Sequence, residues 1–400
     1  MTRRTGPLAA RWWAPALALA CVAAGEARAQ DSRYLIPSFI VSEFYDDNLF
    51  STPGDVESDY ITRLGVGLEA GHESTPLTVI GRASVAGEIY EQHKDFNSAL
   101  ARTEGQLSLA YLPNRRLALS LAGEYLETQT PSELNDLSGL VLGRARASRW
   151  SVAPSLAYRL GRRSNLTAEL SQTNDTLEGG FTDDTQTAGA SLEHRVSSRD
   201  VLSLGYLHRR YSFSTQESSN ADLALLGWTR DFGSRTRLTL KGGPRRTSAG
   251  DVGPELEGLL RHRLKRGELS LAYLKTQATT LGQGGVLDTD SLVLGLALRP
   301  SKWLEILAAP GAYRNTQPGL KVTAYRVHLE TLLHFSRWFH AGAAYSFDLQ
   351  NGNFGAGGDR IRRNVFEARL MVSPQRARRP QPRPIGLEPE PEPPLEPEGE

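Results

Sequence analysis

The sequence has one cysteine in 400 residues, Cys21, which lies in an apolar segment near the N-terminus. A single thiol excludes an intrachain disulfide and a cysteine metal cluster. The chain also lacks the G-x-S-x-G, H-E-x-x-H and phosphate-loop patterns that carry hydrolytic or nucleotide chemistry. We therefore predict no catalytic, cofactor or metal site, and a protein that is not an enzyme.

An excess of charge of one sign is also missing. Lys and Arg number 46 and Asp and Glu 45, which gives a net charge of +1 and no reason to expect a nucleic acid partner. After the first thirty residues no apolar run is long enough for a membrane helix. A transmembrane barrel needs no such run, because only every second residue of its strands faces lipid.

The two ends of the chain differ in composition from the rest. Residues 1–29 combine a basic start, an apolar core and an A-x-A site ending at Ala29, which predicts a secretory signal peptide. Lipoprotein processing at Cys21 is the alternative, although Ala18 stands where such signals usually have leucine. Residues 374–400 hold nine prolines and an acidic run, which predicts a disordered periplasmic tail. That tail is either a solvated spacer or a contact to the cell wall or a periplasmic partner.

Residues 150–172 show the pattern from which the rest of the chain is built. Every second residue from Trp150 to Tyr158 is apolar, a polar turn follows at 161–165, and alternation resumes at Leu166. Two strands with one apolar face each, joined by a short turn, form a β-hairpin.

Alternating runs of this kind recur along residues 30–373 and predict an all-β protein, a transmembrane antiparallel barrel of about eighteen strands. The predicted strands lie near residues 34–45, 60–70, 77–90, 103–112, 117–127, 147–159, 166–174, 186–196, 201–212, 220–231, 236–246, 254–264, 268–277, 290–299, 303–313, 322–335, 338–348 and 362–373. An even strand number places both ends of the barrel on one side.

The connections are predicted to alternate in length. Short polar turns recur near 113–116, 161–165, 197–200, 232–235, 265–267, 299–302 and 336–337, and longer loops are expected at 46–59, 128–146, 174–185, 276–289 and 350–360. Outer-membrane barrels sort their connections in this way, with short turns in the periplasm and long loops outside. Both termini are therefore expected in the periplasm, and the long loops can fold inward and constrict the mouth.

Aromatic residues gather near the ends of the predicted strands. Such rings form girdles at the two membrane interfaces of a barrel. The girdle candidates are Tyr111, Trp150, Tyr158, Trp303 and Trp338.

Charged residues alternate with the apolar ones on the predicted strands, so a watery lumen is expected to hold both signs. The candidates for lining the lumen are Arg63, Arg82, Glu88, Arg159, Glu193, Arg195, Lys241, Arg261, Arg326, His328, Glu330 and Arg369. These groups either set a transverse field for polar solutes or pair to brace the wall, and the sequence leaves both open.

Several features fit the barrel less simply. Pro37, Pro154, Pro244 and Pro310 lie inside predicted strands, where we expect bulges or strand ends. Trp228 falls on the lumen face if Leu223 and Leu225 face lipid, so the register of that strand is ambiguous.

Two sets of residues are of a type that can carry chemistry. His334 and His340 flank the last short turn, and we expect them to be polar residues near the periplasmic rim rather than metal ligands. The paired carboxylates at 46–47 and 183–184 resemble pairs that barrel proteases use, but we expect solvated loop carboxylates.

The segments EFYDDNLF at 43–50 and SDYITR at 58–63, with 97–102 and 130–135, resemble the β-barrel porin 2 family of outer-membrane proteins. The resemblance covers roughly residues 34–373 and leaves the Pro/Glu tail outside. It implies an outer-membrane barrel associated with exopolysaccharide production, in which some members are the pore of an export system. It carries over no residue role.

The sequence and the resemblance together favour a passive outer-membrane pore for polysaccharide export, with outer-membrane lipid, a secreted polysaccharide and periplasmic export components as partners. A general diffusion porin for small solutes, a non-conducting structural barrel and an enzyme barrel are the alternatives.

Overall fold

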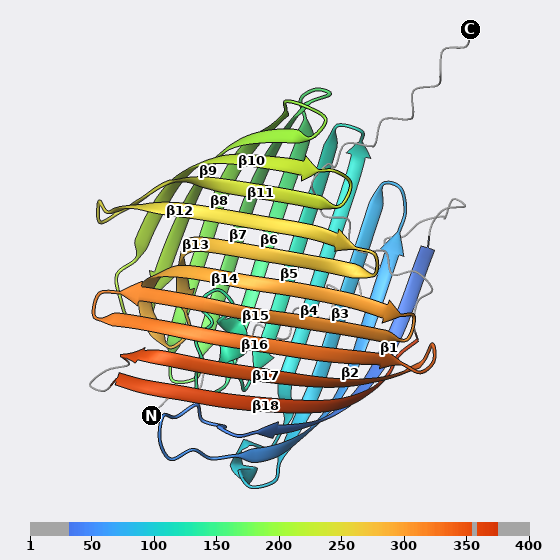
Figure 1. The fold of residues 1–400 in the computed structure, drawn as a ribbon, viewed down its shortest axis with the longest axis vertical. Coiled ribbons are helices and arrows are strands. Elements are labelled where there is room, and N and C mark those ends of the chain that lie inside the picture. Colours follow the sequence, from blue (N-terminus) through green and yellow to red (C-terminus); the bar gives the residue numbers. More distant parts are fainter. Residues whose placement is uncertain (1–31, 354–357, 375–400) are drawn as a thin grey trace, which may run out of the picture.

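The computed structural model describes residues 32–353 and 358–374, and nearly all of them lie in one closed antiparallel sheet (Figure 1). Each strand pairs with its neighbours in the sequence, and β1 (Ser32–Asp46) pairs with both β2 (Asp59–Glu73) and β18 (Gly358–Val372). The predicted antiparallel barrel of eighteen strands is confirmed. The predicted signal peptide and almost all of the Pro/Glu tail lie outside the described residues.

The other strands follow the predicted order. They are β3 (Leu77–Tyr90), β4 (Ser98–Asn114), β5 (Leu117–Thr128), β6 (Ala147–Arg159), β7 (Ser164–Leu177), β8 (Phe181–Arg195), β9 (Asp200–Phe213), β10 (Ser219–Phe232), β11 (Thr236–Thr247), β12 (Val252–Leu264), β13 (Gly267–Thr280), β14 (Gln283–Ser301), β15 (Leu304–Gln317), β16 (Leu320–His334) and β17 (Phe339–Asn353). Two short 3-10 helices, η2 (Lys94–Phe96) and η3 (Pro131–Leu134), lie in the connections. Within the described part of the chain, no helix is long and apolar enough to span a membrane.

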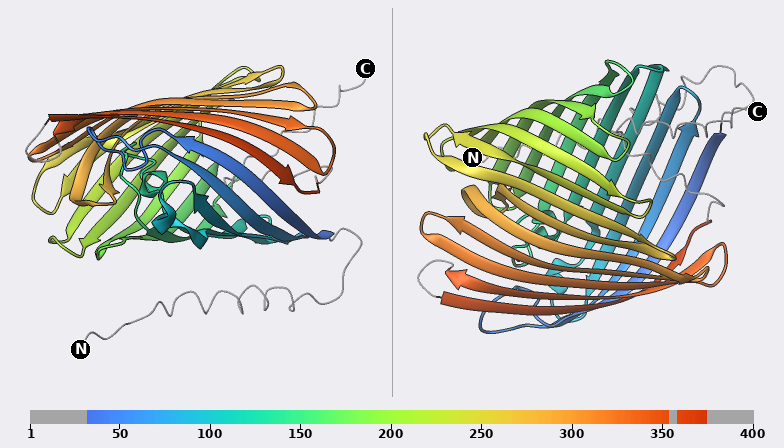
Figure 2. Two further views of the ribbon diagram at one scale, coloured as in Figure 1. Left: turned by 90° about the horizontal axis from the view of Figure 1, so that it is seen from below. Right: turned by 45° about the horizontal axis from the view of Figure 1, so that its top comes forward.

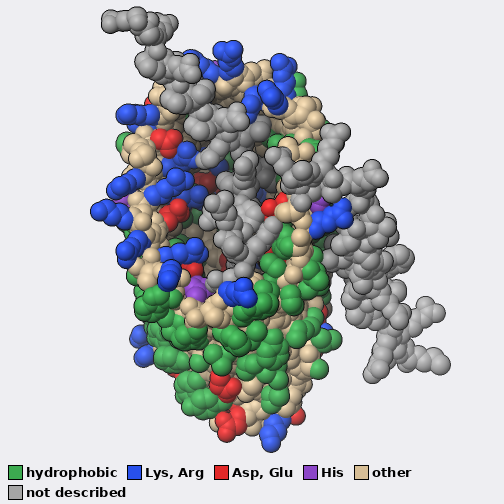
Figure 3. Space-filling model, turned by 90° about the vertical axis from the view of Figure 1, so that its right-hand side faces the viewer, with side chains coloured by type: hydrophobic (Ala, Val, Ile, Leu, Met, Phe, Trp, Pro, Cys, Tyr) green, Lys and Arg blue, Asp and Glu red, His purple; other side chains and the backbone are tan. Residues whose placement is uncertain are grey.

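The outer face of the sheet is apolar because the period-two pattern points every second side chain outward. On β2, Leu64, Val66 and Leu68 are 44–54% exposed, while Ile61 and Arg63 on the opposite face are largely covered. The same alternation recurs on the other strands, and Figure 3 shows hydrophobic side chains gathered over the lower half of the face it views. A closed sheet with an apolar exterior has no edge and satisfies its backbone internally, which is what lipid requires.

The predicted sorting of the connections is right for the short turns and only partly right for the long loops. Connections 47–58 and 129–146 are long loops, as predicted. The predicted loops at 174–185 and 276–289 are wrong, because strands extend through most of these residues. Of the loop predicted at 350–360, both ends lie in β17 and β18, and residues 354–357 lie outside the described residues. Strand β13 runs on to Thr280 and β14 begins at Gln283, so a tight turn stands where a loop was expected.

The four prolines do not cause the predicted bulges. The pairing of β6 with β7 is interrupted beside Pro154 and resumes in the same register, and the same holds beside Pro244 and Pro310. Pro37 lies in the part of β1 that is not paired with β18. Each proline therefore lacks a partner on one side only, which a strand tolerates without a change of register.

The register of β10 is settled by burial. Leu223 is fully buried and packs with Tyr211 and Ala221, whereas Leu226 is 69% exposed. Trp228 lies on the same face as Leu226, and its indole nitrogen donates to Asp200 Oδ1 at 3.1 Å. Leu223 therefore faces inward, and Trp228, on the opposite face of the strand, does not lie in the lumen.

The barrel closes at a short seam. Strand β1 pairs with β2 along its whole length, but with β18 only from Phe39 to Asp46. Beyond the end of β1, the backbone N–H of Asp47 donates to Asn364 O at 3.1 Å and Asn48 Nδ2 donates to Arg362 O at 2.9 Å. Strand β1 begins and strand β18 ends on the side of the short turns (Figure 1).

Candidate functional site: a loop inside the barrel

The connection between β5 and β6, residues 129–146, folds into the barrel, and we call it the inner loop. Figure 2 shows it within the ring of strands rather than above the rim. It begins with η3 and contains several apolar residues that an exposed loop would not be expected to bury. Leu134 and Leu140 are 3% and 1% exposed.

Two apolar clusters fasten the inner loop to distant strands. Leu134 packs with Ala147 at the start of β6 and with Leu281 in the turn between β13 and β14. Leu140 packs with Leu287 of β14 and Val322 of β16. The loop therefore spans from the wall where it originates to the opposite wall of the barrel.

Hydrogen bonds reinforce the attachment to the opposite wall. Asn315 Nδ2 of β15 donates to Ser138 O at 2.7 Å, and the Val141 N–H donates to Gln350 Oε1 of β17 at 2.9 Å. Both Asn315 and Gln350 are buried. Such buried donors and acceptors cost about 1–3 kcal/mol each when left unpaired, so these bonds favour the docked loop over an open one.

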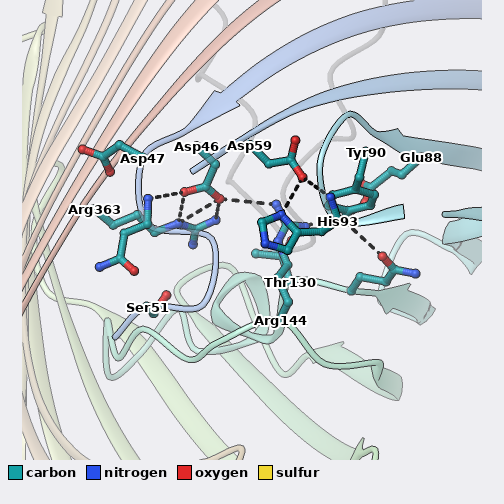
Figure 4. A network of polar contacts seen from close by, with 12 residues as sticks. Asp46, Asp47, Ser51, Asp59, Glu88, Tyr90, His93, Thr130, Arg144 and Arg363 are labelled. Atoms are coloured by element: carbon teal, nitrogen blue, oxygen red, sulfur yellow. Dashed lines mark hydrogen bonds and ion pairs between the residues drawn. The ribbon is translucent and has the colours of Figure 1, made fainter. Parts of the chain in front are cut away.

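Arg144 fastens the other end of the inner loop to the closing seam (Figure 4). Its guanidinium donates to Thr130 Oγ1 at 2.6 Å and lies 3.4 Å from Asp46 Oδ2 and 3.7 Å from Glu88 Oε2. Asp46 is fully buried and also accepts bonds from Arg363, the shortest at 2.6 Å. The loop is thus tied by charge to β1 and β3, and through Asp46 to Arg363 of β18.

Glu88 has further partners in the same network. Arg63 of β2 approaches its Oε1 at 2.5 Å, and the Tyr90 hydroxyl donates to its Oε2 at 2.6 Å. A buried carboxylate is stable only when paired and hydrogen-bonded, and this one has two arginines and a phenol. At the strand β4 side, Arg102 pairs with both Glu104 and Glu133 of the inner loop.

Asp136 of the inner loop is exposed. Partial desolvation raises the pKa of its carboxyl above the usual value, and Glu133 adds to that effect while Arg326 and Arg149 oppose it. Arg326 binds Asp348 at 2.9 Å and also reaches Ser132 O of the loop at 3.4 Å. A protonation change at Asp136 would therefore be felt directly beside the loop anchors.

A second long connection, 91–97, forms a smaller ion-pair cluster beside the seam. His93 lies between two carboxylates, with Nδ1 2.8 Å from Asp59 Oδ2 and Nε2 2.6 Å from Glu57 Oε2. Hydrogen bonds to Glu57 and Asp59 raise the pKa of His93 above its usual value. Its ring also meets Phe50 edge-on, with centroids 5.2 Å apart.

The candidates predicted to line the lumen all lie on the face of their strands opposite the exposed apolar side chains. Most have ionic or hydrogen-bonded partners on their own or neighbouring strands. The partnered candidates are Arg63 and Glu88, Arg82 with Glu69, Lys241 with Glu257, Arg326 with Asp348, His328 with Ser346 and Glu330, and Glu330 with Arg369. Among the described residues, no ion pair is recorded for the others, Arg159, Glu193, Arg195 and Arg261. Whether any of the twelve lines a conducting path stays a prediction.

The girdle candidates lie near the strand ends. Tyr111, Tyr158, Trp303 and Trp338 are exposed beside or within the short turns, and Trp150 lies near the start of β6 at the other end. Their role at the membrane interfaces stays a prediction.

The carboxylate pairs weighed for catalysis are not simple solvated loop groups. Asp46 belongs to the arginine network, and Asp47 accepts bonds from the side chain and backbone of Asn364 at 2.5 and 2.6 Å. Asp183 is buried opposite Asp175, which binds Arg149 at 2.6 and 2.7 Å. The expectation of solvated carboxylates is therefore wrong for Asp46 and Asp183, which strand closure and strand pairing bury, while Asp47 is half-buried and hydrogen-bonded.

The two histidines at the last short turn contact each other. His334 Nδ1 and His340 Nδ1 are 2.9 Å apart, and His340 is 3% exposed. Within the described residues, no cluster of three or more His, Cys, Asp or Glu side chains is placed to hold a metal ion.

Sequence reasoning placed Arg245 on the inner face of its strand but missed Arg144 and Arg363, which organise the contacts of the inner loop. Arg245 joins Glu255 at 3.0 Å and Asp288 at 2.5 Å, and Arg209 reaches the same Glu255 at 2.8 Å. The apolar residues within 134–142 are the sequence signal that indicates a buried loop, because a solvated loop is usually polar.

A scan of protein-family models finds no match, and a search of curated proteins finds none. Among solved structures, the chain is similar to OccK7 (OpdD) of Pseudomonas aeruginosa, with 11% identity, 87% of this chain and 99% of that chain covered, and a TM-score of 0.48. OpdO of the same organism has 13% identity, with 86% of this chain and 96% of that chain covered and a TM-score of 0.46. A loop-deletion mutant of OmpT, an outer membrane protein of Vibrio cholerae, has 10% identity, with 86% of this chain and 99% of that chain covered and a TM-score of 0.40. These similarities assign no family, and the resemblance to the β-barrel porin 2 family stays a prediction.

Proposed function

We propose that the chain is a passive channel of a Gram-negative outer membrane that passes small polar solutes. Its outer wall is apolar and its inner wall carries both signs of charge. Barrels of sixteen to eighteen strands have room for an aqueous lumen. The observation that carries the proposal is the inner loop, because it narrows a lumen of that width from within.

The inner loop also indicates where solutes would pass. Its recorded hydrogen bonds and ion pairs reach β1, β3, β4, the β13–β14 turn and β15–β17, and none joins it to β8–β12 in the described part of the chain. A passage on that side would be narrowed by the β13–β14 hairpin, because the Tyr211 hydroxyl of β9 donates to Gln277 O and Arg245 of β11 binds Asp288. On this wall the pair Lys241–Glu257 is more exposed than Arg209 and Glu255. Selection would follow from width and from these fixed charges.

Polysaccharide export remains the prediction that the family resemblance suggested. No feature of the inner loop specifically favours a polymer, and the loop leaves less room than an unobstructed barrel of this size. We therefore place passage of small solutes first.

The test is conductance of the purified full chain in planar bilayers. We expect stepwise conductance that rises when the inner loop is loosened by Arg144→Gln. The matched control is Arg146→Gln, because Arg146 lies two residues away with a side chain that is 61% exposed. Absence of conductance in the intact and loosened proteins would support a non-conducting structural barrel instead.

A deletion strain separates the two transport hypotheses. If the protein is a channel for small solutes, the deletion strain should take up small solutes more slowly and keep normal surface polysaccharide. Loss of surface polysaccharide with polymer retained in the periplasm would favour export and overturn the present choice.

A further inference from the structure

The short turns share a chemical character that the channel proposal does not use. Seven of the eight turns carry exposed Lys or Arg, and none of the eight contains Asp or Glu. We call these residues the turn ring: Arg115, Arg116, Arg162, Arg163, Arg199, Arg235, Lys265, Arg266, Lys302 and Arg337. Figure 3 views this end and shows Lys and Arg side chains spaced around it.

Among the described residues, Arg199 is the one member of the turn ring for which an electrostatic effect on a carboxylate, that of Asp200, is recorded. No ion pair within 4 Å is recorded for any of its members among the described residues. Arg337 instead lies over the Trp338 ring at 5.8 Å, and Arg266 donates to the backbone oxygen of Pro300. The opposite end has the reverse character, since loops 47–58 and 91–97 hold five carboxylates and one lysine. The positive charge is therefore placed at one end, in a chain whose net charge is only +1.

The chain leaves the barrel at the same end. Strand β18 finishes at Val372, and the Ser373 N–H donates to Trp338 O at 2.9 Å beside the last turn. The following residues carry four arginines between 376 and 383, and then six glutamates and no cation between 388 and 400. The arginines at 376–383 follow directly in the chain and are repelled by the turn ring, because their charge has the same sign. The glutamates at 388–400 lie further along the chain and are attracted to the ring.

The length of the intervening chain suits a return to the ring. Proline-rich chain extends at about 3.1 Å per residue, so the fifteen steps from Ser373 to Glu388 reach about 45 Å. Successive turns are separated by two strands of about 4.8 Å each, or at least about 10 Å along the rim. The turns with Lys302 and Lys265, the next two along the rim beyond the β16–β17 turn, are within that reach.

We propose that residues 388–400 dock on the turn ring of the same chain. The occupant is this acidic segment because its charge is opposite, its attachment point lies at the ring, and tethering gives it an effective concentration of about a millimolar. Alternation of Glu and Pro favours an extended backbone, which would space the carboxylates along several turns and lower the entropy lost on docking. Anionic lipid headgroups are the rival occupant. The proposal does not depend on conduction.

The experiment uses the full chain in nanodiscs of phosphatidylcholine at low salt. A carbodiimide joins carboxylates to nearby amines without a spacer, and mass spectrometry locates the products. We expect crosslinks from residues 388–400 to Lys265 and Lys302, and at least about a fivefold lower yield at 1 M salt, where the Debye length falls to about 3 Å. Absence of these crosslinks, or a yield that salt leaves unchanged, would overturn the proposal.

A second measurement does not rely on crosslinking. The six glutamates between 388 and 400 are replaced by glutamine in the full chain, and the acylation rates of individual lysines are compared. Lys265 and Lys302 should react at least about threefold faster in the variant, as expected for loss of a tethered ligand. Lys94, at the other end of the barrel, is the internal control and should not change.

Anionic lipid separates the two occupants. In nanodiscs that contain phosphatidylglycerol, the difference between the two proteins at Lys265 and Lys302 should persist. Its disappearance, with both proteins equally protected, would assign the turn ring to lipid headgroups and reject docking of the tail.

Discussion

Replacement of Arg144 by glutamine should release the inner loop while leaving the barrel folded. The side chain of Arg144 is 6% exposed and contributes a charged hydrogen bond to Thr130 together with ion pairs to Asp46 and Glu88. A hydrogen bond to a charged group contributes about 1.5–3 kcal/mol. Orphaning a buried charge costs about 3–5 kcal/mol, but Asp46 keeps Arg363 and Glu88 keeps Arg63, so the full penalty does not apply.

We therefore expect the docked loop to lose about 2–3 kcal/mol relative to the open one, which raises the open population about 30- to 150-fold. Hydrogen exchange measures this directly. The N–H groups of Gly139 and Val141, bonded to Asn135 O at 2.8 Å and Gln350 Oε1 at 2.9 Å, are the reporters. Their exchange should accelerate by the same factor when opening is in rapid equilibrium.

The control is Arg146→Gln, which removes an exposed pair with Glu127 and should cost no more than about 1 kcal/mol. Equal acceleration in the two variants would refute the role assigned to Arg144. So would equal acceleration of amides in β5 and β6, since that pattern reports unfolding of the barrel rather than release of the loop.

Three further predictions concern faces, pH and backbone. Leu156→Arg, on the outer wall, should lower the free energy of unfolding in urea by about 2–4 kcal/mol if Leu156 lies near the bilayer midplane. Ser155→Arg, on the inner face, should have a mild effect. Equal costs for the two changes would mean that the faces are reversed. Because the folded pKa of His93 is raised, its stabilising contribution is complete below the unfolded pKa of about 6.5 and is lost as pH rises through the folded value. Hydrogen exchange at residues 91–97 should therefore show a greater loss of protection across that pH range in the native protein than in His93→Gln, after correction for intrinsic rates. Gly139→Ala should strain the inner loop, since Gly139 has φ +62° and a Cβ there would overlap the Tyr313 ring, whereas Gly250→Ala, at φ +88° with open space around it, should cost only backbone strain; equal exchange of the loop amides in both variants would contradict this.

Much of the fold was predictable because the strands carry their own signal. Alternation of apolar and polar residues from Trp150 to Tyr158 predicts the bounds of β6. The same alternation locates all of the remaining strands. Strand ends beyond the apolar band were not predictable in this way. Residues such as Thr280 and Gln283 sit in extended strands without an apolar face, so their polar composition resembled a loop.

The site was less predictable because its contacts join residues far apart in the sequence. Arg144 and Asp46 are separated by 98 residues, and Asp46 and Arg363 by 317. No local pattern marks such a partnership. The direction of the charged side chains on the strands follows from alternation, but the partner of each depends on register and on where the inner loop lands.

The short seam has a consequence for the order in which this protein forms. Since β1 and β18 are the first and last strands, the barrel cannot close before nearly the whole chain has been made, and both edges stay open until then. Asp46 and Arg363 meet only when the two edges align correctly. A slip by two residues would leave both buried charges without each other, so this pair selects one register from several that the backbone would accept.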